Sequence, residues 1–339
     1  MGPPDQELIE AARRGDSDAF ERLVAPYRGE LHAHCYRMLG SVQDAEDALQ
    51  EALLGAWRGL PGFAGRSSVR VWLYRITTNV CARLGRRRPK RLLPLDYRPA
   101  STSVLDLGEP VDEPVWLEPY PDWRLERAAT AVDPAARYEL RESVELAFVM
   151  ALQTLPARQR AVLMLCEVLA FSAAEVAAML DTTVPSVNSA LQRARQGLTP
   201  RLPEASQQAT LRTLGEDGRR ALVEAFMAAW ERADVAALLD LLAGDARFTM
   251  PPLPAWFSGR DAIGRLLHER MFATPWRLVP LWASGQLAFA CYQGTPDGSA
   301  FHLGALNVLT LRGERIAALT AFLDPTIYDQ LGLPRELPA

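Results

Sequence analysis

The sequence predicts a multi-domain protein with two all-α helical domains, the second a helix-turn-helix, followed by a C-terminal α+β domain. Apolar residues recur at steps of three and four from Asp5 to about Arg88 and again from Tyr138 to Leu202, which is the period of an amphipathic helix. After Pro203 the pattern changes to a few helices and then β-type runs. At about 100–200 residues per domain, a chain of 339 residues has room for these parts.

The boundaries between these parts follow composition. Residues 96–138 contain six prolines and an acidic excess without a sustained period, so we expect an interdomain linker with one ordered clasp at residues 116–123. In the last part, expected helices at 216–232, 234–242 and 259–272 precede four runs rich in Val, Leu and aromatic residues. These runs lie at 276–283, 286–293, 301–311 and 315–323, and the turn residues between them predict antiparallel strands.

Composition excludes several classes of protein. No run approaches 18 apolar residues, and the N-terminus lacks a basic start followed by an apolar stretch, so we expect neither a membrane span nor a secretory signal, and a cytoplasmic location. The cysteines form no CxxC pair and no cluster with histidine, so we expect no zinc site, no disulfide framework and no cofactor; they are Cys35, Cys81, Cys166 and Cys291.

Charge is segregated along the chain although the net charge is only −4. Residues 1–56 hold 11 Asp and Glu against 5 Arg, whereas residues 57–98 hold 10 Arg and Lys90 against Asp96 alone. Such a basic block is typical of a phosphate-binding surface, although a charge run is more often a solvated face.

The helix-turn-helix is predicted within residues 156–198. Ser172–Leu180 forms a short helix, Asp181 and Thr182 form the turn, and the second helix begins after Thr183 as the N-cap. We expect an inward stripe of Val184, Val187, Leu191, Ala194 and Leu198. The opposite face carries short polar groups and guanidiniums that suit base edges and phosphates in a major groove. A helical hairpin with a solvated polar face is the plainer alternative.

This segment resembles domain 4 of extracytoplasmic-function sigma factors, the part that reads the −35 promoter element. The sequence departs from the family where Asn188 and Ala190 replace basic residues of the early recognition helix. The resemblance implies −35 contacts by Thr183, Ser186, Asn188, Ser189, Gln192, Arg193 and Arg195.

Residues 40–63 and 65–88 resemble domain 2 of the same sigma factors. On the first expected helix Asp44, Asp47 and Glu51 stand at i, i+3 and i+7, so the carboxylates share a face with Gln50. The resemblance implies that this face grips the β′ coiled coil of RNA polymerase. An acidic face is usually just solvated, and no histidine accompanies it at ligand spacing, which disfavours catalysis.

The second expected helix of this region mixes stacking, hydrogen-bonding and cationic side chains at helical spacing, as promoter melting requires. Trp72 fits the hydrophobic core nearly as well as DNA. By resemblance, the loop at 62–70 captures the flipped −10 base. The residues expected at the −10 element are Ser67, Ser68, Trp72, Arg75, Ile76, Asn79, Arg83, Arg86, Arg87 and Arg88.

Residues 214–332 resemble the SnoaL-like polyketide cyclase and ketosteroid isomerase superfamily, in which a curved sheet and helices enclose a pocket. Catalytic relatives use a carboxylate and often a histidine there. His302 and Asp324 are the candidates in this sequence, and we expect a structural role for both. The residues expected to line the pocket are Trp230, Phe248, Met250, Trp256, Phe257, His302, Asn307 and Phe322.

Sigma factors with this appendage form a set that lacks a conventional anti-sigma gene, and the WLEPYPD segment of the linker resembles its signature. The resemblance implies that the appended domain regulates the sigma domains. The expected domains are sigma domain 2 at 1–95, the linker at 96–138, sigma domain 4 at 139–203 and the SnoaL-like domain at 204–339.

The sequence therefore predicts a sigma factor, not an enzyme, that binds the β′ and β subunits of core RNA polymerase and recognises the −35 and −10 elements of promoter DNA. The sequence leaves open whether a small ligand binds in the C-terminal pocket. The alternatives are a cyclase or isomerase with a degenerate sigma-like targeting region and a one-component repressor, which would leave the acidic helix face unexplained.

Overall fold

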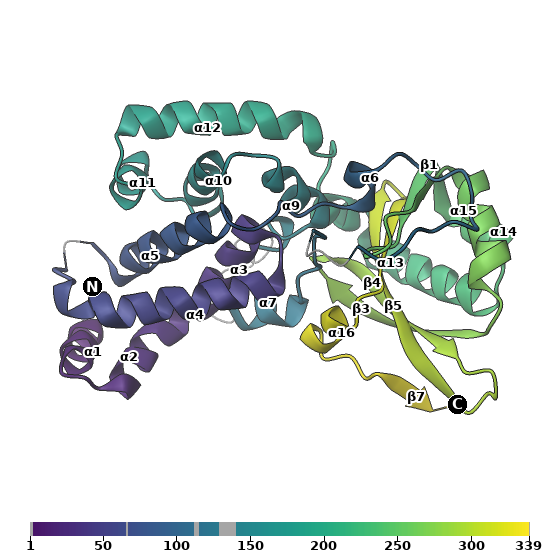
Figure 1. Cartoon of the computed structure of the whole chain (residues 1–339), viewed down its shortest axis with the longest axis horizontal. Helices are drawn as coiled ribbons and strands as arrows, with labels where there is room; N and C mark the ends of the chain where they lie inside the picture. Colours follow the sequence, from purple (N-terminus) through teal and green to yellow (C-terminus); the bar gives the residue numbers. More distant parts are fainter. Residues whose placement is uncertain (1–2, 66, 112–114, 129–139, 339) are drawn as a thin grey trace. The chain divides into compact units, whose positions relative to one another are not determined.

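The computed structural model describes residues 3–65, 67–111, 115–128 and 140–338, and it divides the chain into two compact units (Figure 1). Unit 1 is formed by Met1–Arg91 and Trp123–Leu202. Unit 2 is formed by Leu92–Asp122 and Pro203–Ala339. Unit 1 is helical and unit 2 combines helices with a sheet, so the fold class expected from the sequence is confirmed.

The N-terminal half of unit 1 is a group of helices whose ends are fixed by local signals. The side chain of Ser41 accepts a hydrogen bond from the amide of Asp44 at the start of α4, and Gly40 ends α3 with a φ of 74°, which glycine adopts without strain. The elements are α1 (Pro3–Arg13), α2 (Ser17–Val24), η1 (Ala25–Tyr27), α3 (Arg28–Leu39), α4 (Val42–Gly59), η2 (Leu60–Gly62) and α5 (Val69–Leu84).

The C-terminal half of unit 1 contains the helix-turn-helix, and sequence signals explain its turn. Ser172 and Glu175 form a capping box at the start of α11, Asp181 takes a left-handed φ of 46°, and Thr183 caps α12. The elements are α7 (Asp122–Ala128), α9 (Leu146–Gln153), α10 (Ala157–Leu163), the π turn η4 (Met164–Val168), α11 (Ala173–Met179), α12 (Val184–Leu198) and η5 (Thr199–Arg201).

Unit 2 is built on one seven-stranded sheet with the order β2-β1-β6-β5-β4-β3, and β7 pairs with β5. Strands β1 and β6 are parallel, and the other pairs are antiparallel. The strands are β1 (Leu242–Thr249), β2 (Trp256–Ser258), β3 (Trp276–Ala283), β4 (Gln286–Gly294), β5 (Ala300–Arg312), β6 (Arg315–Phe322) and β7 (Glu336–Pro338).

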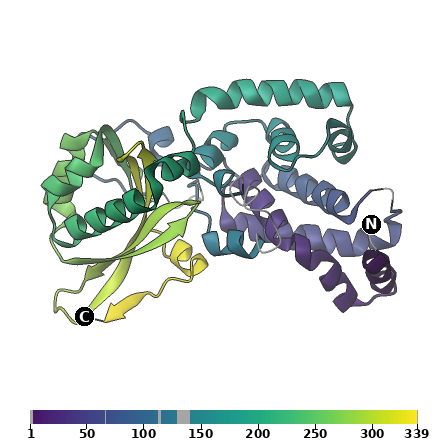
Figure 2. The same ribbon diagram turned by 180° about the vertical axis from the view of Figure 1, so that it is seen from behind.

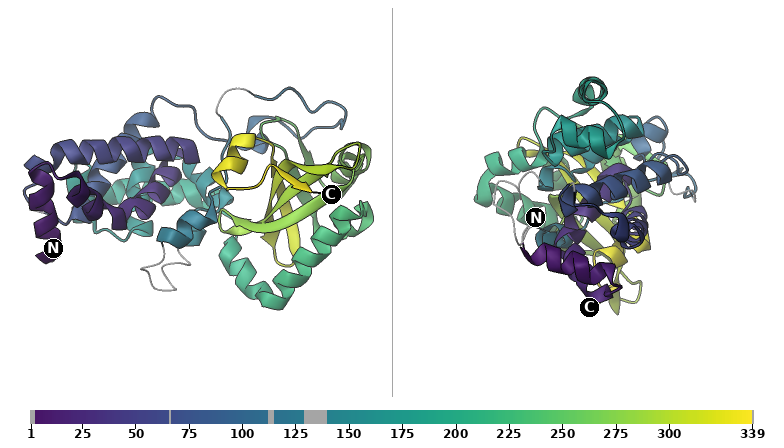
Figure 3. Two further views of the ribbon diagram at one scale, coloured as in Figure 1. Left: turned by 90° about the horizontal axis from the view of Figure 1, so that it is seen from below. Right: turned by 90° about the vertical axis from the view of Figure 1, so that its left-hand side faces the viewer.

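Helices of unit 2 cover the sheet, and the long helix α13 (Gln207–Glu231) lies across one of its faces (Figures 2 and 3). Phe226 and Trp230 of α13 pack with Phe289 of the sheet in the hydrophobic core. The helix bends at Gly215, whose φ is 72°. The other helical elements of unit 2 are α6 (Pro94–Tyr97), α14 (Val235–Leu241), α15 (Arg260–Leu266), the π turn η6 (Leu267–Met271) and α16 (Pro325–Gln330).

Much of the proline-rich stretch that the sequence places in a linker packs inside unit 2. We call Leu92–Asp122 the connecting segment. Its Val104 belongs to the core of unit 2, and its Tyr120 is fully buried. At the β3–β4 turn, the Tyr120 amide donates to Ser284 Oγ (2.9 Å), and the Gly285 amide donates to Asp122 Oδ1 (2.8 Å). Residues 129–138 of the expected linker lie outside the described residues.

Candidate nucleic-acid interface

The recognition helix α12 presents the side chains that the sequence assigns to the −35 element. Asn188, Ser189, Gln192 and Arg193 are exposed along one side. Thr183 is exposed as well, and its hydroxyl accepts a hydrogen bond from the amide of Ser186, which is half-buried. Arg195 is exposed and pairs with Glu167. The helix therefore offers hydrogen-bonding groups and guanidiniums on one surface, as a major-groove reader requires.

Two residues of the stripe expected to face inward differ from the sequence expectation, since Leu191 is only half-buried. Val184 is 39% exposed instead of facing inward. The buried stripe begins at Val187 and continues with Ala190, Ala194 and Leu198, so it does not include the first residue of α12.

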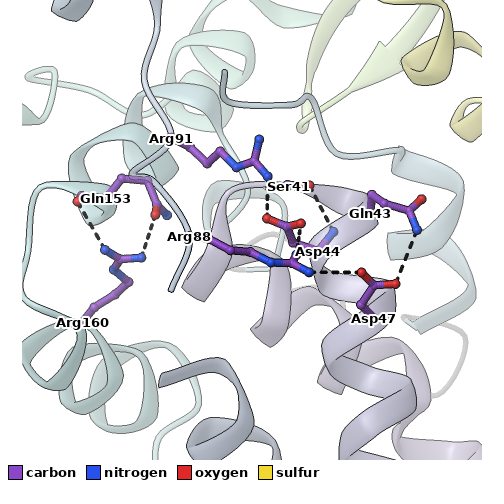
Figure 4. A network of polar contacts seen from close by, with 8 residues as sticks. All are labelled: Ser41, Gln43, Asp44, Asp47, Arg88, Arg91, Gln153 and Arg160. Carbon is purple, nitrogen blue, oxygen red and sulfur yellow. Dashed lines mark hydrogen bonds and ion pairs between the residues drawn. The ribbon is translucent and has the colours of Figure 1, made fainter. Parts of the chain in front are cut away.

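The acidic face of α4 is partly covered by the basic stretch that follows α5 (Figure 4). Asp44 is buried and forms ion pairs with Arg88 and Arg91. Arg88 also lies 3.3 Å from Asp47. The sequence places Asp44, Asp47, Gln50 and Glu51 on one face, but only the last three are exposed in the structure.

Helix α5 carries half of the residues expected at the −10 element, and the expected residues lie in different environments. Trp72 is half-buried against the Phe63 ring, with 4.7 Å between centroids, and Ser68 caps the helix through the amide of Val71. Arg83 pairs with Glu51. Of the remaining expected residues, Ile76 and Arg88 are half-buried and Ser67, Arg75, Asn79, Arg86 and Arg87 are exposed.

The helix-turn-helix half docks on the end of α3, and Gln153 and Arg160 make the central hydrogen bonds. Gln153 Nε2 donates to the Arg37 carbonyl (3.2 Å), and Arg160 donates to the Met38 carbonyl. Carbonyls in the last turn of a helix have no partner within that helix and lie at the negative end of its dipole. A buried amide and a buried guanidinium from the other half of unit 1 therefore cap α3.

A second part of this contact lies on α5. Arg70 stacks over the Phe171 ring with 4.7 Å to its centroid, and the Tyr74 and Phe171 rings meet edge to face at 5.2 Å. Arg75 is 3.2 Å from Asp181 in the turn before the recognition helix. We call the interactions of α3 and α5 with residues 153–181 the closed contact.

Buried ionisable groups in unit 1 have shifted pKa values. Burial, with a smaller effect of Arg37, lowers the pKa of His34 to about 3, and its Nε2 lies 2.9 Å from the Thr78 hydroxyl. Burial, with a smaller effect of Arg124, lowers the pKa of His32 to about 3 as well. Burial lowers the pKa of Arg160 to about 10, so this side chain stays cationic at pH 7.

The C-terminal pocket expected from the sequence is largely filled. The cavity beside Trp230 and Phe248 has a volume of about 10 Å³, which is room for about one water molecule. His302 is exposed near Glu336, outside this cavity, and Asp324 caps α16 by accepting from the Thr326 amide. Asp324 thus stabilises the start of α16, whereas His302 lies on the surface and does not line the pocket for which it was predicted.

The other expected pocket residues are divided among three environments. Trp256 is half-buried and donates from Nε1 to the Arg98 carbonyl. Phe322 is buried, and its carbonyl accepts from the Tyr328 hydroxyl. The residues that lie buried in the interior of unit 2 are Trp230, Phe248, Met250, Phe257 and Asn307.

Sequence reasoning missed the residues of the closed contact. Gln153, Arg160 and Phe171 carry no local mark of this role, because a buried arginine and an exposed one look alike in a helical pattern. Among the residues that the structure describes, no helix is long and apolar enough to cross a membrane, and no group of His, Cys, Asp and Glu could hold a metal ion.

Comparison with protein families divides the chain in the same order as the sequence does. Sigma-70 region 2 matches residues 23–91, sigma-70 region 4 matches residues 145–198, and a SnoaL-like domain matches residues 223–319.

Curated relatives cover the helical part or nearly the whole chain. The chain is 43% identical over 332 residues to the ECF RNA polymerase sigma factor SigG of Mycobacterium tuberculosis. The aligned region covers 96% of this chain and 86% of the relative. It is 30% identical to the RNA polymerase sigma-H factor of Pseudomonas aeruginosa over 59% of this chain and 97% of that protein. The crystal structure of the extracytoplasmic function sigma factor SigJ of M. tuberculosis shares the fold, with a TM-score of 0.59, 21% identity, and coverage of 93% of this chain and 99% of that chain.

Proposed function

The chain belongs to the extracytoplasmic-function sigma factors of RNA polymerase, and from this premise we propose how its surfaces divide the work of promoter-directed initiation. Region 2 (23–91) binds core polymerase and the −10 element, region 4 (145–198) binds the −35 element, and unit 2 regulates the two. The cytoplasm is the proposed place of action because RNA polymerase transcribes there.

The proposed surface for core polymerase is the exposed part of the α4 face, Asp47, Gln50 and Glu51. Leu54 lies one turn further on the same side and is one of the exposed large apolar residues of the chain. An apolar side chain among polar ones is typical of a protein interface. Asp44 has a different task in this proposal, because its ion pairs with Arg88 and Arg91 hold the end of the basic stretch against α4.

Contacts to the −35 element are proposed for the exposed side chains of α12, and contacts to the −10 element for α5 and the loop before it. Asn188 and Gln192 carry amides that can pair with adenine, and Arg193 carries a guanidinium that can pair with guanine or phosphate. The observation that carries the proposal is this set of exposed polar side chains on a capped helix of a helix-turn-helix.

The closed contact cannot persist when both promoter elements are bound. By their names the two elements lie about 25 base pairs apart, which is about 85 Å at about 3.4 Å per base pair. In the closed contact, Arg75 of α5 lies 3.2 Å from Asp181, directly before the recognition helix. We therefore propose that unit 1 opens between α3 and α9 before the promoter is bound and that the closed form is the inactive one.

For unit 2 we propose a regulatory role without catalysis or a cofactor. The cavity beside Trp230 and Phe248, with about 10 Å³, has room for about one water molecule, and neither His302 nor Asp324 lines it. The connecting segment enters unit 1 at Trp123, directly after Asp122, which is held at the β3–β4 turn. The buried Gln208 of α13 donates to the Gly285 carbonyl of the same turn. Asp122 and Gln208 therefore both bind the β3–β4 turn of unit 2.

Binding of core polymerase tests the first part of the proposal. Changing Asp47→Lys and Glu51→Lys together reverses two charges at the proposed interface. We expect this variant to lose at least 100-fold in affinity for core enzyme in a pull-down titration. Glu7→Lys with Glu10→Lys is the matched control, because these glutamates are exposed on α1, outside the proposed surface. Equal binding by both variants, with unchanged helical circular dichroism, would refute the assignment.

A further inference from the structure

The first turn of the recognition helix exposes an aliphatic side chain among polar ones. Val184 is the first residue of α12 and is 39% exposed. Thr183 directly before it and Asn188 one turn further along the helix are polar and exposed as well. A large apolar side chain on a solvent-facing surface leaves its methyl groups in water, so contact with an apolar group of a partner is favourable.

The local structure does not require a valine at this position. Thr183 is the N-cap, and its hydroxyl accepts from the amide of Ser186. A hydrophobic staple would join the residue before the cap, Thr182, to Val187, and thus would not include Val184. The Thr182 hydroxyl accepts from Arg158 (2.5 Å) instead. The cap and the turn are therefore complete without the Val184 side chain.

We propose that Val184 contacts the 5-methyl group of a thymine in the −35 element and thereby determines specificity at that base pair. This inference rests on the proposed function of α12. Residues at the N-terminal end of a recognition helix are the ones that reach base edges in the major groove. Thymine alone presents a methyl group there, and apolar side chains read it by direct contact.

Asn188 refines the site. Residues four apart on a helix are neighbours on its surface, so the Val184 methyl groups and the Asn188 amide lie one turn apart on the same side. A turn rises about 5.4 Å, and successive base pairs along DNA rise about 3.4 Å. An asparagine amide pairs with adenine in the major groove. The −35 element should therefore contain a thymine one or two base pairs from an adenine.

Removal of single methyl groups from the DNA tests this contact. The full-length chain is assembled with core RNA polymerase, its promoter is identified by mapping transcription starts, and each thymine of the −35 element is replaced in turn by deoxyuridine. We expect one replacement to weaken promoter binding about fourfold, the factor that corresponds to one buried methyl group. The Val184→Ala variant should bind the unmodified promoter about fourfold more weakly and should show no further loss with deoxyuridine at that position.

Val279→Ala is the matched control, since Val279 is 38% exposed but lies on β3 of unit 2. It should keep the full response to deoxyuridine. Affinity for core polymerase, measured separately, should be the same for both variants. Three results would overturn the inference alone: an element without thymine, a wild-type complex that responds to none of the replacements, or a Val184→Ala complex that responds as strongly as wild type. A wild-type complex that does not distinguish its −35 element from a scrambled one would instead overturn the proposed function of α12 as well.

Discussion

The closed contact of unit 1 and the connecting segment of unit 2 hold parts of the chain together by different means. The closed contact combines hydrogen bonds of Gln153 and Arg160 to the end of α3 with the contacts of Arg70 and Tyr74 to the Phe171 ring. The connecting segment is fixed by buried side chains and by backbone pairing, in which the Leu92 amide donates to the Val115 carbonyl (2.7 Å). Burial of large apolar side chains stabilises more strongly than single hydrogen bonds, which lose much of their gain to desolvation.

This difference indicates that the closed contact opens more readily than the connecting segment leaves unit 2. The hydrogen bonds of the closed contact can be exchanged for hydrogen bonds to water or to a partner, and the single Phe171 ring is its largest apolar contribution from the helix-turn-helix side. Exposing Tyr120 and Leu117 of the connecting segment would return large apolar surfaces to water. For the same reason, truncation after Leu202 would not simply release the sigma regions, because it would strip the connecting segment of the sheet on which it packs.

The largest effect is expected in the connecting segment. Trp116 is 8% exposed and stacks edge to face on Tyr97, whereas Trp123 is 40% exposed. Replacing Trp116 with alanine should destabilise unit 2 by about 3–5 kcal/mol, as is usual for a buried tryptophan. Trp123→Ala is the matched control and should cost less than about 1 kcal/mol. Peptide-resolved hydrogen exchange at β3 and β4 measures both, and equal protection in the two variants would contradict the comparison.

The next effect is expected in the closed contact. Arg160→Met removes the guanidinium that caps α3 but keeps an apolar chain of similar length, so the closed form should lose about 2–3 kcal/mol. Arg158→Met, on the same helix but exposed, should leave it unchanged. Hydrogen exchange in α5 should rise in the first variant only. The same variant should also form promoter complexes at lower concentration with core polymerase; unchanged complex formation despite faster exchange would show that the closed form does not inhibit.

The smallest effect is a dependence of stability on pH, which we expect in unit 1 but not in unit 2. The pKa values of His32 and His34 are about 3 in the folded chain, compared with an ordinary value of 6.5. Below pH 6.5 the unfolded chain takes up protons that the folded chain does not, so the stability present above pH 6.5 falls as the pH drops toward 3. The loss is up to about 1.4 kcal/mol per pH unit for each histidine.

Hydrogen exchange at pH 6.5 and 5.5 tests this predicted loss of stability. The carboxylates of an unfolded chain are still largely ionised in that interval, so they contribute little to the change. The charged groups next to these histidines are Arg37 beside His34, and Arg124 and Glu46 beside His32. Unit 1 should lose protection and unit 2 should keep it. Replacing both histidines with leucine should remove the slope, and a slope that persists in this variant would assign it to other groups.

Local signals in the sequence were sufficient for the elements and their order. The cap at Thr183, the apolar steps of three and four, and the turn residues between the β-type runs each depend on neighbours a few positions away. They led to the two helical parts, the helix-turn-helix and the α+β domain. The polar surface of α12 could also be predicted, because the period of one helix fixes which residues share a side.

Tertiary structure decided what those elements bury. Asp44 has the spacing of a surface carboxylate but is covered by Arg88 and Arg91, which lie more than 40 positions later in the chain. Val184 has the spacing of a core residue but is 39% exposed. The spacing of side chains is a property of one helix, whereas their burial depends on which distant segments pack against it, and that packing is set by the fold of the whole unit.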